Sequence, residues 1–194
     1  REVYGQSKKL TNNEDDVKIE NSESPYTASK IFGESILHSY SKCYGIEYLI
    51  FRFSNIYGMY DTSDRVIPLF LKQLKDKRNL KIYGKNKYLD FTYIDDAINA
   101  LILGISKFNK LKNQTFNISC GEASTIINVA KYLIKKTNSK SKIFIKKNRT
   151  GEIMGYIANI NKAKKKLKFK PKTNLKDGLD KTILWYKENY LWKN

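Results

Sequence analysis

The stretch YTASKIFGESILHSYSKCYGIEYLIFRF, residues 26–53, decides the fold class of this chain. From Tyr26 to about Tyr44 its apolar and aromatic residues recur at helical spacing, and the pattern stops at Gly45, as a helix does. Residues 46–53 then form a nearly continuous apolar and aromatic run of strand length. Such a run is typical of a parallel strand covered on both faces, so a helix leading into it predicts an α/β fold.

Helices and strands alternate outward from this stretch. Residues 5–25 are polar, close on Pro25 and are expected to form a loop. The further expected elements are helices at 66–74, from Asp95 or Asp96 to 105, from Ser124 or Thr125 to about 136, at 161–167 and at 175–190, and strands at 80–83, 91–94, 115–119 and 143–145. This order predicts an α/β sheet followed by a smaller mixed α/β lobe.

Charge is unevenly distributed along the 194 residues. Lys plus Arg number 37 and Asp plus Glu 19, a net charge of +18, which divides into −3 over residues 1–64 (7 − 10) and +21 over residues 65–194 (30 − 9). Such asymmetry can indicate a nucleic-acid or other anionic partner. However, 32 of the basic residues are Lys and only five are Arg, whose planar fork phosphate and base readers prefer. A solvated surface is therefore favoured over nucleic-acid binding.

Composition limits the class of protein further. Hydrophobic residues at 41% and aromatic residues at 13% suffice for a packed core. No apolar run approaches membrane-span length, and no signal-like segment opens the chain. Cys43 and Cys120 are far apart and His38 is the single histidine, so no zinc-binding pattern is present in the sequence. We expect a cytoplasmic protein with reduced thiols and no metal.

The pair Tyr26 and Lys30 is the first feature that suggests chemistry. Residues four apart lie on one face of a helix, so the phenol and the ammonium can share a site. A phenol is a poor base at neutral pH, but a neighbouring cation favours its deprotonated form. Tyr26 could then accept a proton from a substrate hydroxyl. A chance surface pair is the alternative, because the chain is rich in both residue types.

Nine ordered segments support the first reading. They are EVYG (2–5), SPYTASK (24–30), FRFSNIYG (51–58), VIPLF (66–70), IYG (82–84), LDFTYIDDA (89–97), FNIS (116–119), RTGE (149–152) and KTILWY (181–186). In order and approximate spacing they resemble the extended short-chain dehydrogenase/reductase family, specifically the NAD-dependent nucleotide-sugar epimerases and dehydratases of the UDP-glucose 4-epimerase type. The resemblance implies the C-terminal part of a Rossmann-like doubly wound parallel sheet plus a substrate-binding lobe. Residues 1–64 would belong to the NAD-binding domain and 65–194 mostly to the lobe, with 91–107 returning to the sheet.

The resemblance also implies NAD as the cofactor and a role for each matching residue. Tyr26 is similar to the catalytic base, which takes the proton of the sugar 4-hydroxyl while NAD takes the C4 hydride to give a 4-keto intermediate. Lys30 is similar to the residue that binds the nicotinamide ribose and tunes the tyrosine. Phe53 and Ser54 occupy the positions where the family's backbone approaches the nicotinamide.

The substrate implied is a nucleotide-diphosphate sugar. Its candidate binding residues are Asn55, Arg65, Val66, Tyr83, Arg149 and Glu152. By resemblance, Asn55 contacts diphosphate and sugar, Tyr83 packs on the base, and Arg149 clamps the diphosphate. Glu152 would accept a hydrogen bond from the nucleotide ribose, and Arg65, with Val66 after it, is a further phosphate-site candidate. Taken alone, Tyr83 could be core packing, Asn55 a turn residue and Glu152 a surface partner of the arginine.

Two positions depart from the family pattern. Leu89 stands where the family usually has an arginine that contacts the diphosphate, and Lys85 or Lys87 could substitute as a point charge. In the 4,6-dehydratase branch an Asp-Glu pair eliminates water, and here that pair is Arg1-Glu2. Dehydration is therefore disfavoured, whereas Glu2 leaves decarboxylation open.

Two parts of the family pattern are expected upstream of Arg1. One is the catalytic Ser or Thr, which belongs immediately before it. The other is the glycine fingerprint for the cofactor pyrophosphate, because no two glycines here are closer than Gly151 and Gly155. On the order of 100 residues of βαβ structure should supply it. The hypothesis is thus the C-terminal part of a nucleotide-sugar epimerase, inactive by itself. The resemblance also implies a homodimer through the helix that contains Tyr26 and its neighbour. The alternatives are a decarboxylase or dehydratase of the same family, or a noncatalytic remnant that binds sugar nucleotides or polyanions.

Overall fold

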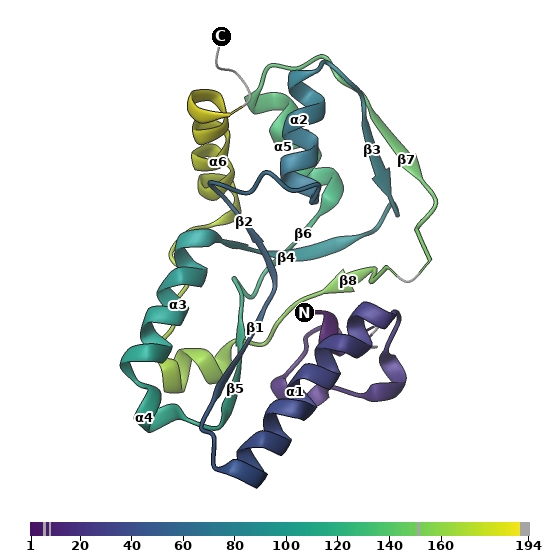
Figure 1. Cartoon of the computed structure of the whole chain (residues 1–194). Helices are drawn as coiled ribbons and strands as arrows, with labels where there is room; N and C mark the ends of the chain where they lie inside the picture. The colour runs from purple at the N-terminus through teal and green to yellow at the C-terminus, as the bar shows by residue number, and fades with distance from the viewer. Residues whose placement is uncertain (6, 8, 151, 191–194) are drawn as a thin grey trace.

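The computed structural model describes residues 1–5, 7, 9–150 and 152–190 (Figure 1). Its strands are β1 Leu49–Phe53, β2 Asn55–Tyr57, β3 Leu80–Tyr83, β4 Tyr88–Tyr93, β5 Gln114–Ile118, β6 Ala123–Thr125, β7 Ile143–Lys146 and β8 Gly155–Tyr156. Its helices are α1 Pro25–Tyr44, α2 Val66–Lys75, α3 Ile94–Ser106, α4 Phe108–Leu111, α5 Ile126–Lys136 and α6 Leu175–Asn189, with short 3-10 turns at Glu2–Tyr4, Glu14–Asp16 and Ile19–Asn21 and a π-helical turn at Ala163–Leu167. None of the helices described is long and apolar enough to cross a membrane.

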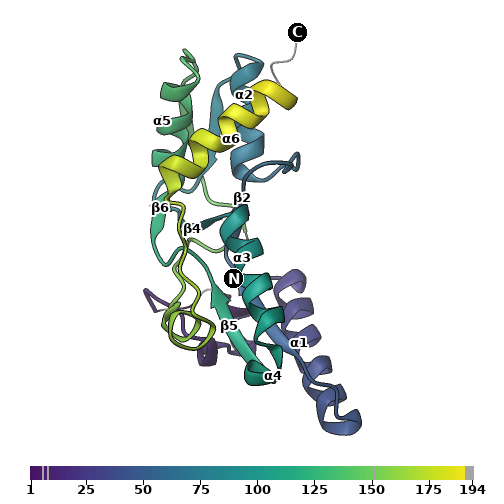
Figure 2. The ribbon, with the colours of Figure 1, turned by 90° about the vertical axis from the view of Figure 1, so that its left-hand side faces the viewer.

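Strand β4 connects two lobes. It pairs with β2 and β8 in parallel and with β6 in antiparallel fashion. On one side of it, β1 and β5 pair in parallel and carry α1, α3 and α4; on the other, β3 and β7 pair in parallel beside α2, α5 and α6. Figures 1 and 2 show the two lobes end to end, with β2 and β4 between them. The expected α/β architecture with parallel strands and a smaller mixed lobe is confirmed.

The helix that opens the deciding stretch forms as expected. Ser24 caps α1 by accepting a hydrogen bond from the Thr27 N–H at 3.2 Å, and Pro25 occupies the first turn, where a missing N–H costs nothing. Gly45 ends the helix in a left-handed conformation, with φ of 68°. The following strand is shorter than its apolar run, because pairing with β5 extends only over Leu49–Phe53.

The start of α3 corrects one expectation. The helix begins at Ile94 after Tyr93, so neither Asp95 nor Asp96 is its N-cap. The Asp96 carboxylate instead accepts hydrogen bonds from the backbone N–H groups of Lys172 and Thr173, both at 2.9 Å. Asp96 therefore fixes the segment that leads into α6, a tertiary role that the local sequence did not indicate.

The two lobes have separate cores. Beside β4, helices α2, α5 and α6 pack side chains that include Leu71, Leu133 and Leu179. The other core surrounds Phe116 of β5. There α3 lies directly against β1, because a Cβ on Gly104 would come within 2.4 Å of the Phe51 ring. Burial of apolar side chains thus holds each lobe separately.

A buried ion pair joins α1 to the sheet. Arg52 of β1 donates from Nε and Nη2 to the Glu34 carboxylate of α1, at 2.8 and 2.6 Å. Its Nη1 donates to the Tyr4 hydroxyl at 3.0 Å. Thr27 is the only fully buried residue of α1, and the partly buried Ile31 packs against a core cluster, so this helix has no extended buried apolar face to set its position. We infer that the Arg52–Glu34 pair sets it.

A buried carboxylate ties β4 to two distant segments. Asp90 is fully buried and accepts hydrogen bonds from the backbone N–H groups of Cys120, Gly121 and Ala158, at 3.2, 3.1 and 3.4 Å. Burial nevertheless raises the pKa of Asp90 to about 6, because loss of hydration outweighs these bonds. The carboxyl group therefore binds its proton more tightly in the folded chain than in the unfolded chain.

Replacing Arg52 with methionine should destabilise the fold strongly. The Arg52 and Glu34 side chains are only 8% and 18% exposed, so the substitution leaves a largely desolvated carboxylate without its partner. The expected loss in free energy of unfolding, measured by urea denaturation, is about 3 kcal/mol. The matched control is Lys112→Met, which breaks the exposed Lys112–Glu47 pair and should cost less than about 1 kcal/mol. Equal losses in the two variants would contradict the assigned role of Arg52.

Asp90 should give the fold a measurable pH dependence. Its pKa is near 4 when unfolded and about 6 when folded, so the folded chain binds more protons between these values. The stabilising contribution is complete below pH 4 and is lost as the pH rises through 6. We expect the free energy of unfolding to fall by up to about 3 kcal/mol over this window relative to Asp90→Asn. Urea titrations of both proteins from pH 4 to 7 measure the difference, and parallel profiles would refute the assignment.

Candidate functional site

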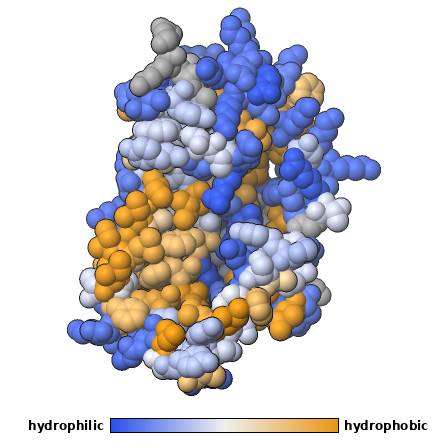
Figure 3. All heavy atoms as spheres, viewed as in Figure 1, coloured by the Kyte–Doolittle hydropathy of each residue, from blue (hydrophilic) through white to orange (hydrophobic). Residues whose placement is uncertain are grey.

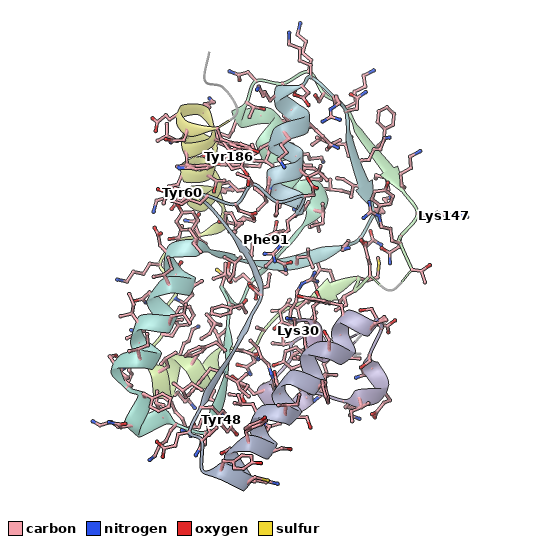
Figure 4. All side chains as sticks on the ribbon, viewed as in Figure 1. Lys30, Tyr48, Tyr60, Phe91, Lys147 and Tyr186 are labelled. Atoms are coloured by element: carbon pink, nitrogen blue, oxygen red, sulfur yellow. The ribbon has the colours of Figure 1, made fainter. Side chains whose placement is uncertain are left out.

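A cavity of about 920 Å³ lies where α1, the ends of β1 and β3, and the start of α2 meet. All the residues singled out from the sequence as site candidates line it: Tyr26, Lys30, Phe53, Ser54, Asn55, Arg65, Val66, Tyr83, Arg149 and Glu152. In Figure 4, Lys30 on α1 and Phe91 on β4 mark two of its walls. The fold thus gathers into one cavity residues that five separate segments of the chain contribute.

Helix α1 presents the phenol and the ammonium together. Tyr26 and Lys30 occupy its first two turns, and the Lys30 Nζ lies 5.1 Å from the centroid of the Tyr26 ring. Tyr26 is 57% exposed, so its hydroxyl is accessible to a ligand. Glu34, one further helical turn along the same face, also lines the cavity and accepts the hydrogen bonds of Arg52. Sequence reasoning missed Glu34, although its spacing of four residues from Lys30 was a usable signal.

The chain crosses from one sheet to another at Ser54, on the cavity wall. The Ser54 N–H donates to the carbonyl of Ile118 at 3.2 Å, and its hydroxyl lies 2.6 Å from that of Thr92. Next to it, the Asn55 side-chain amide donates to the carbonyl of Asp90 at 3.1 Å. These bonds fix the crossing relative to β4 and β5, so the backbone at this wall is held in place before any ligand arrives.

The other end of the cavity combines an aromatic ring with opposite charges. The Arg149 guanidinium carbon lies 3.9 Å from the centroid of the Tyr83 ring. Glu152 contacts two cations, the Lys87 Nζ at 2.7 Å and an Arg149 nitrogen at 3.6 Å. A guanidinium lying on a ring keeps in-plane N–H groups that can donate to phosphate oxygens. This end is therefore suited to an aromatic base and a phosphate group.

The structure separates the two lysines that could replace the family arginine. Leu89 is buried and forms an apolar part of the wall. Lys87 lines the cavity, whereas Lys85 does not. Spacing along the chain could not distinguish them, because both precede β4 in the same short connection.

Comparison with known proteins identifies the family. The profile of the NAD dependent epimerase/dehydratase family matches residues 1–119. The human dTDP-D-glucose 4,6-dehydratase is 32% identical over 203 aligned residues, which take in 100% of this chain and 56% of the enzyme. The UDP-glucuronate 4-epimerase of Thermodesulfobacterium geofontis is 29% identical, covering 90% of this chain and 54% of the enzyme.

Solved structures agree with the sequence comparison. The UDP-glucose 4-epimerase of Thermotoga maritima, solved with UDP-glucose, superposes with a TM-score of 0.87 at 28% identity, over 96% of this chain and 60% of that protein. The UDP-glucuronic acid 4-epimerase of Bacillus cereus, solved with UDP-glucuronic acid and NAD, gives 0.90 at 29% identity, over 97% and 60%. This chain therefore spans little more than half the length of these relatives. By its motifs, its fold and these matches, the chain belongs to the NAD dependent epimerase/dehydratase family.

Proposed function

We propose that this chain is the C-terminal part of a nucleotide-sugar 4-epimerase of the UDP-glucose/UDP-galactose type, acting through a 4-keto intermediate. The observation that carries the proposal concerns the lining of one cavity. It is lined both by the Tyr26–Lys30 pair and by the Tyr83 ring with the Arg149 guanidinium lying on it. The first suits proton transfer at a sugar hydroxyl, and the second suits a nucleotide diphosphate.

The walls near α1 fit the nicotinamide end of NAD. Lys30 is available to the nicotinamide ribose, and the fixed backbone at Phe53 and Ser54 can approach the ring closely. The described residues contain no glycine-rich turn for the pyrophosphate of the cofactor. This supports a pyrophosphate-binding site on a separate part of the fold. When bound, NAD would accept and return the hydride of the sugar carbon.

The residues of this chain handle the proton and the position of the sugar. Tyr26 accepts the proton of the 4-hydroxyl, and the Lys30 ammonium lies beside it, 5.1 Å from the centroid of its ring. Arg149 holds the diphosphate, and Arg65, with Val66, supports it at the start of α2. Glu152 accepts from the nucleotide ribose, and Asn55 contacts the diphosphate and the sugar. Anchoring the diphosphate leaves the sugar free to present either face to the cofactor.

We also propose that a further half of the fold completes this protein. In the described part of the chain β1 pairs only with β5, so its other edge has no strand beside it. Helix α3 exposes an apolar stripe at Ile98, Leu101, Ile102 and Ile105, and Figure 3 shows this apolar area beside β1. Residues 1–64 would then belong to the NAD-binding domain and 65–194 mostly to the nucleotide-sugar lobe, with 91–107 returning to the sheet. The chain alone would be inactive.

Other features of the proposal rest on the exposed face of α1 and on the cysteines. Phe32, Ile36 and Tyr40 are exposed, which supports a homodimer formed through this helix.

Cys43 and Cys120 are free, as in a reducing cytoplasm. Glu2 lines the cavity and supports decarboxylation of a sugar acid as the second candidate reaction.

The decisive experiment joins this chain to the N-terminal half of a relative and measures the interconversion of UDP-glucose and UDP-galactose with NAD. Tyr26→Phe removes the base, so kcat should fall at least about 100-fold with little change in KM. Tyr44→Phe on the same helix, away from the cavity, should retain full activity. An inactive completed protein, or full activity of Tyr26→Phe, would overturn the proposed function.

A further inference from the structure

Lys87, one of the two lysines that could replace the family arginine, forms an ion pair with Glu152 on the wall of the cavity. We propose that they are a counter-ion exchange pair: Glu152 neutralises Lys87 while the site is empty, and a phosphate of the ligand takes the place of the carboxylate. Lys87 thereby becomes a phosphate-binding residue of this chain. The inference rests on the proposed function, because it names a residue that would recognise the diphosphate.

The backbone holds Lys87 in position. Its N–H donates to the carbonyl of Gly84 at 3.3 Å, and its own carbonyl accepts from the N–H of Ile126 at 3.0 Å. The side chain is only 14% exposed, which separates it from the many solvated lysines of this chain. A lysine this enclosed requires a counter-ion, because an unpaired charge loses hydration without compensation.

The local charges favour the exchange. Leu89, which lines the same cavity, contributes no charge. Among the described residues, Glu152 pairs with Lys87 at 2.7 Å and Arg149 at 3.6 Å, so one carboxylate is shared between two positive groups. An incoming phosphate can satisfy Lys87 with a charge-assisted hydrogen bond of similar length. The exchange also weakens the ion pair between Glu152 and Arg149. Both cations therefore become available to a diphosphate together.

After the exchange, the Glu152 carboxylate can contact another part of the ligand. Glu152 is 30% exposed, so it can move to accept hydrogen bonds from a ribose hydroxyl, the role that the resemblance implies for it. A single carboxylate therefore serves first as the counter-ion of the empty site and then as a ligand contact. The pair would favour diphosphate ligands over the uncharged nucleoside, which cannot replace the carboxylate.

The test compares three variants by isothermal titration calorimetry at low salt, with inorganic pyrophosphate, UDP and uridine as probes. Lys87→Gln should weaken pyrophosphate and UDP binding about tenfold or more, the usual effect of one charge-assisted hydrogen bond, and leave uridine unchanged. Lys85→Gln, in the same connection but outside the cavity, is the matched control and should stay within about twofold of the unsubstituted protein. Glu152→Gln should tighten pyrophosphate binding several-fold, because the competing carboxylate is gone.

The opposite signs of the two main variants are the critical result. Lys87→Gln and Glu152→Gln remove the same ion pair, so a merely structural role would change pyrophosphate affinity in the same direction in both. Changes of the same sign, or no change in Lys87→Gln, overturn the inference. If UDP binds with the same affinity to Lys87→Gln as to the unsubstituted protein, the inference fails and the proposed function stands. If pyrophosphate follows the expected pattern but UDP binds no better than pyrophosphate, the proposed function fails alone. If neither probe binds, both fail.

Discussion

The buried pair between Arg52 and Glu34 is the constraint on which the site depends. Helix α1 presents Tyr26 and Lys30 to the cavity, yet Thr27 is its only fully buried residue. Apart from Ile31, which packs against a buried cluster, its anchor is a polar contact to β1. Because Tyr26, Lys30 and Glu34 follow one another at spacings of four residues, the pair that anchors the helix lies on the face that carries the proposed chemistry.

Asp90 performs the corresponding task at the centre of the molecule. It belongs to β4, the strand that links the lobes, and its carboxylate orders the segments after β5 and β8. The carbonyl of the same residue accepts from the side chain of Asn55 at the cavity wall. One residue thus fixes both the junction of the lobes and a candidate ligand contact, so a change in its protonation would reach the site through the backbone.

Local patterns predicted the elements that depend on local physics. The cap at Ser24, the stop at Gly45 and the apolar run before Phe53 were sufficient for α1 and β1. The two- and three-residue strands β2, β6 and β8 were missed, because they exist only through pairing with β4, whose position depends on tertiary contacts. The ordered motifs likewise predicted a set of residues that all line one cavity. They could not indicate that Arg149 lies on Tyr83 or that Lys87 rather than Lys85 reaches the cavity, since neither follows from spacing along the chain.

The geometry of each ion pair decides what it can do in this protein. The Arg52–Glu34 pair is bidentate, and its side chains are 8% and 18% exposed, so a ligand would have to break two hydrogen bonds beneath the surface to reach it. The Lys87–Glu152 pair has a single contact, with side chains 14% and 30% exposed on the cavity wall. A phosphate can replace that carboxylate without leaving either charge buried and alone. Both pairs line the cavity, but the bidentate pair with the less exposed carboxylate holds a helix in place, whereas the pair with a single contact and a more exposed carboxylate can exchange that carboxylate for a phosphate.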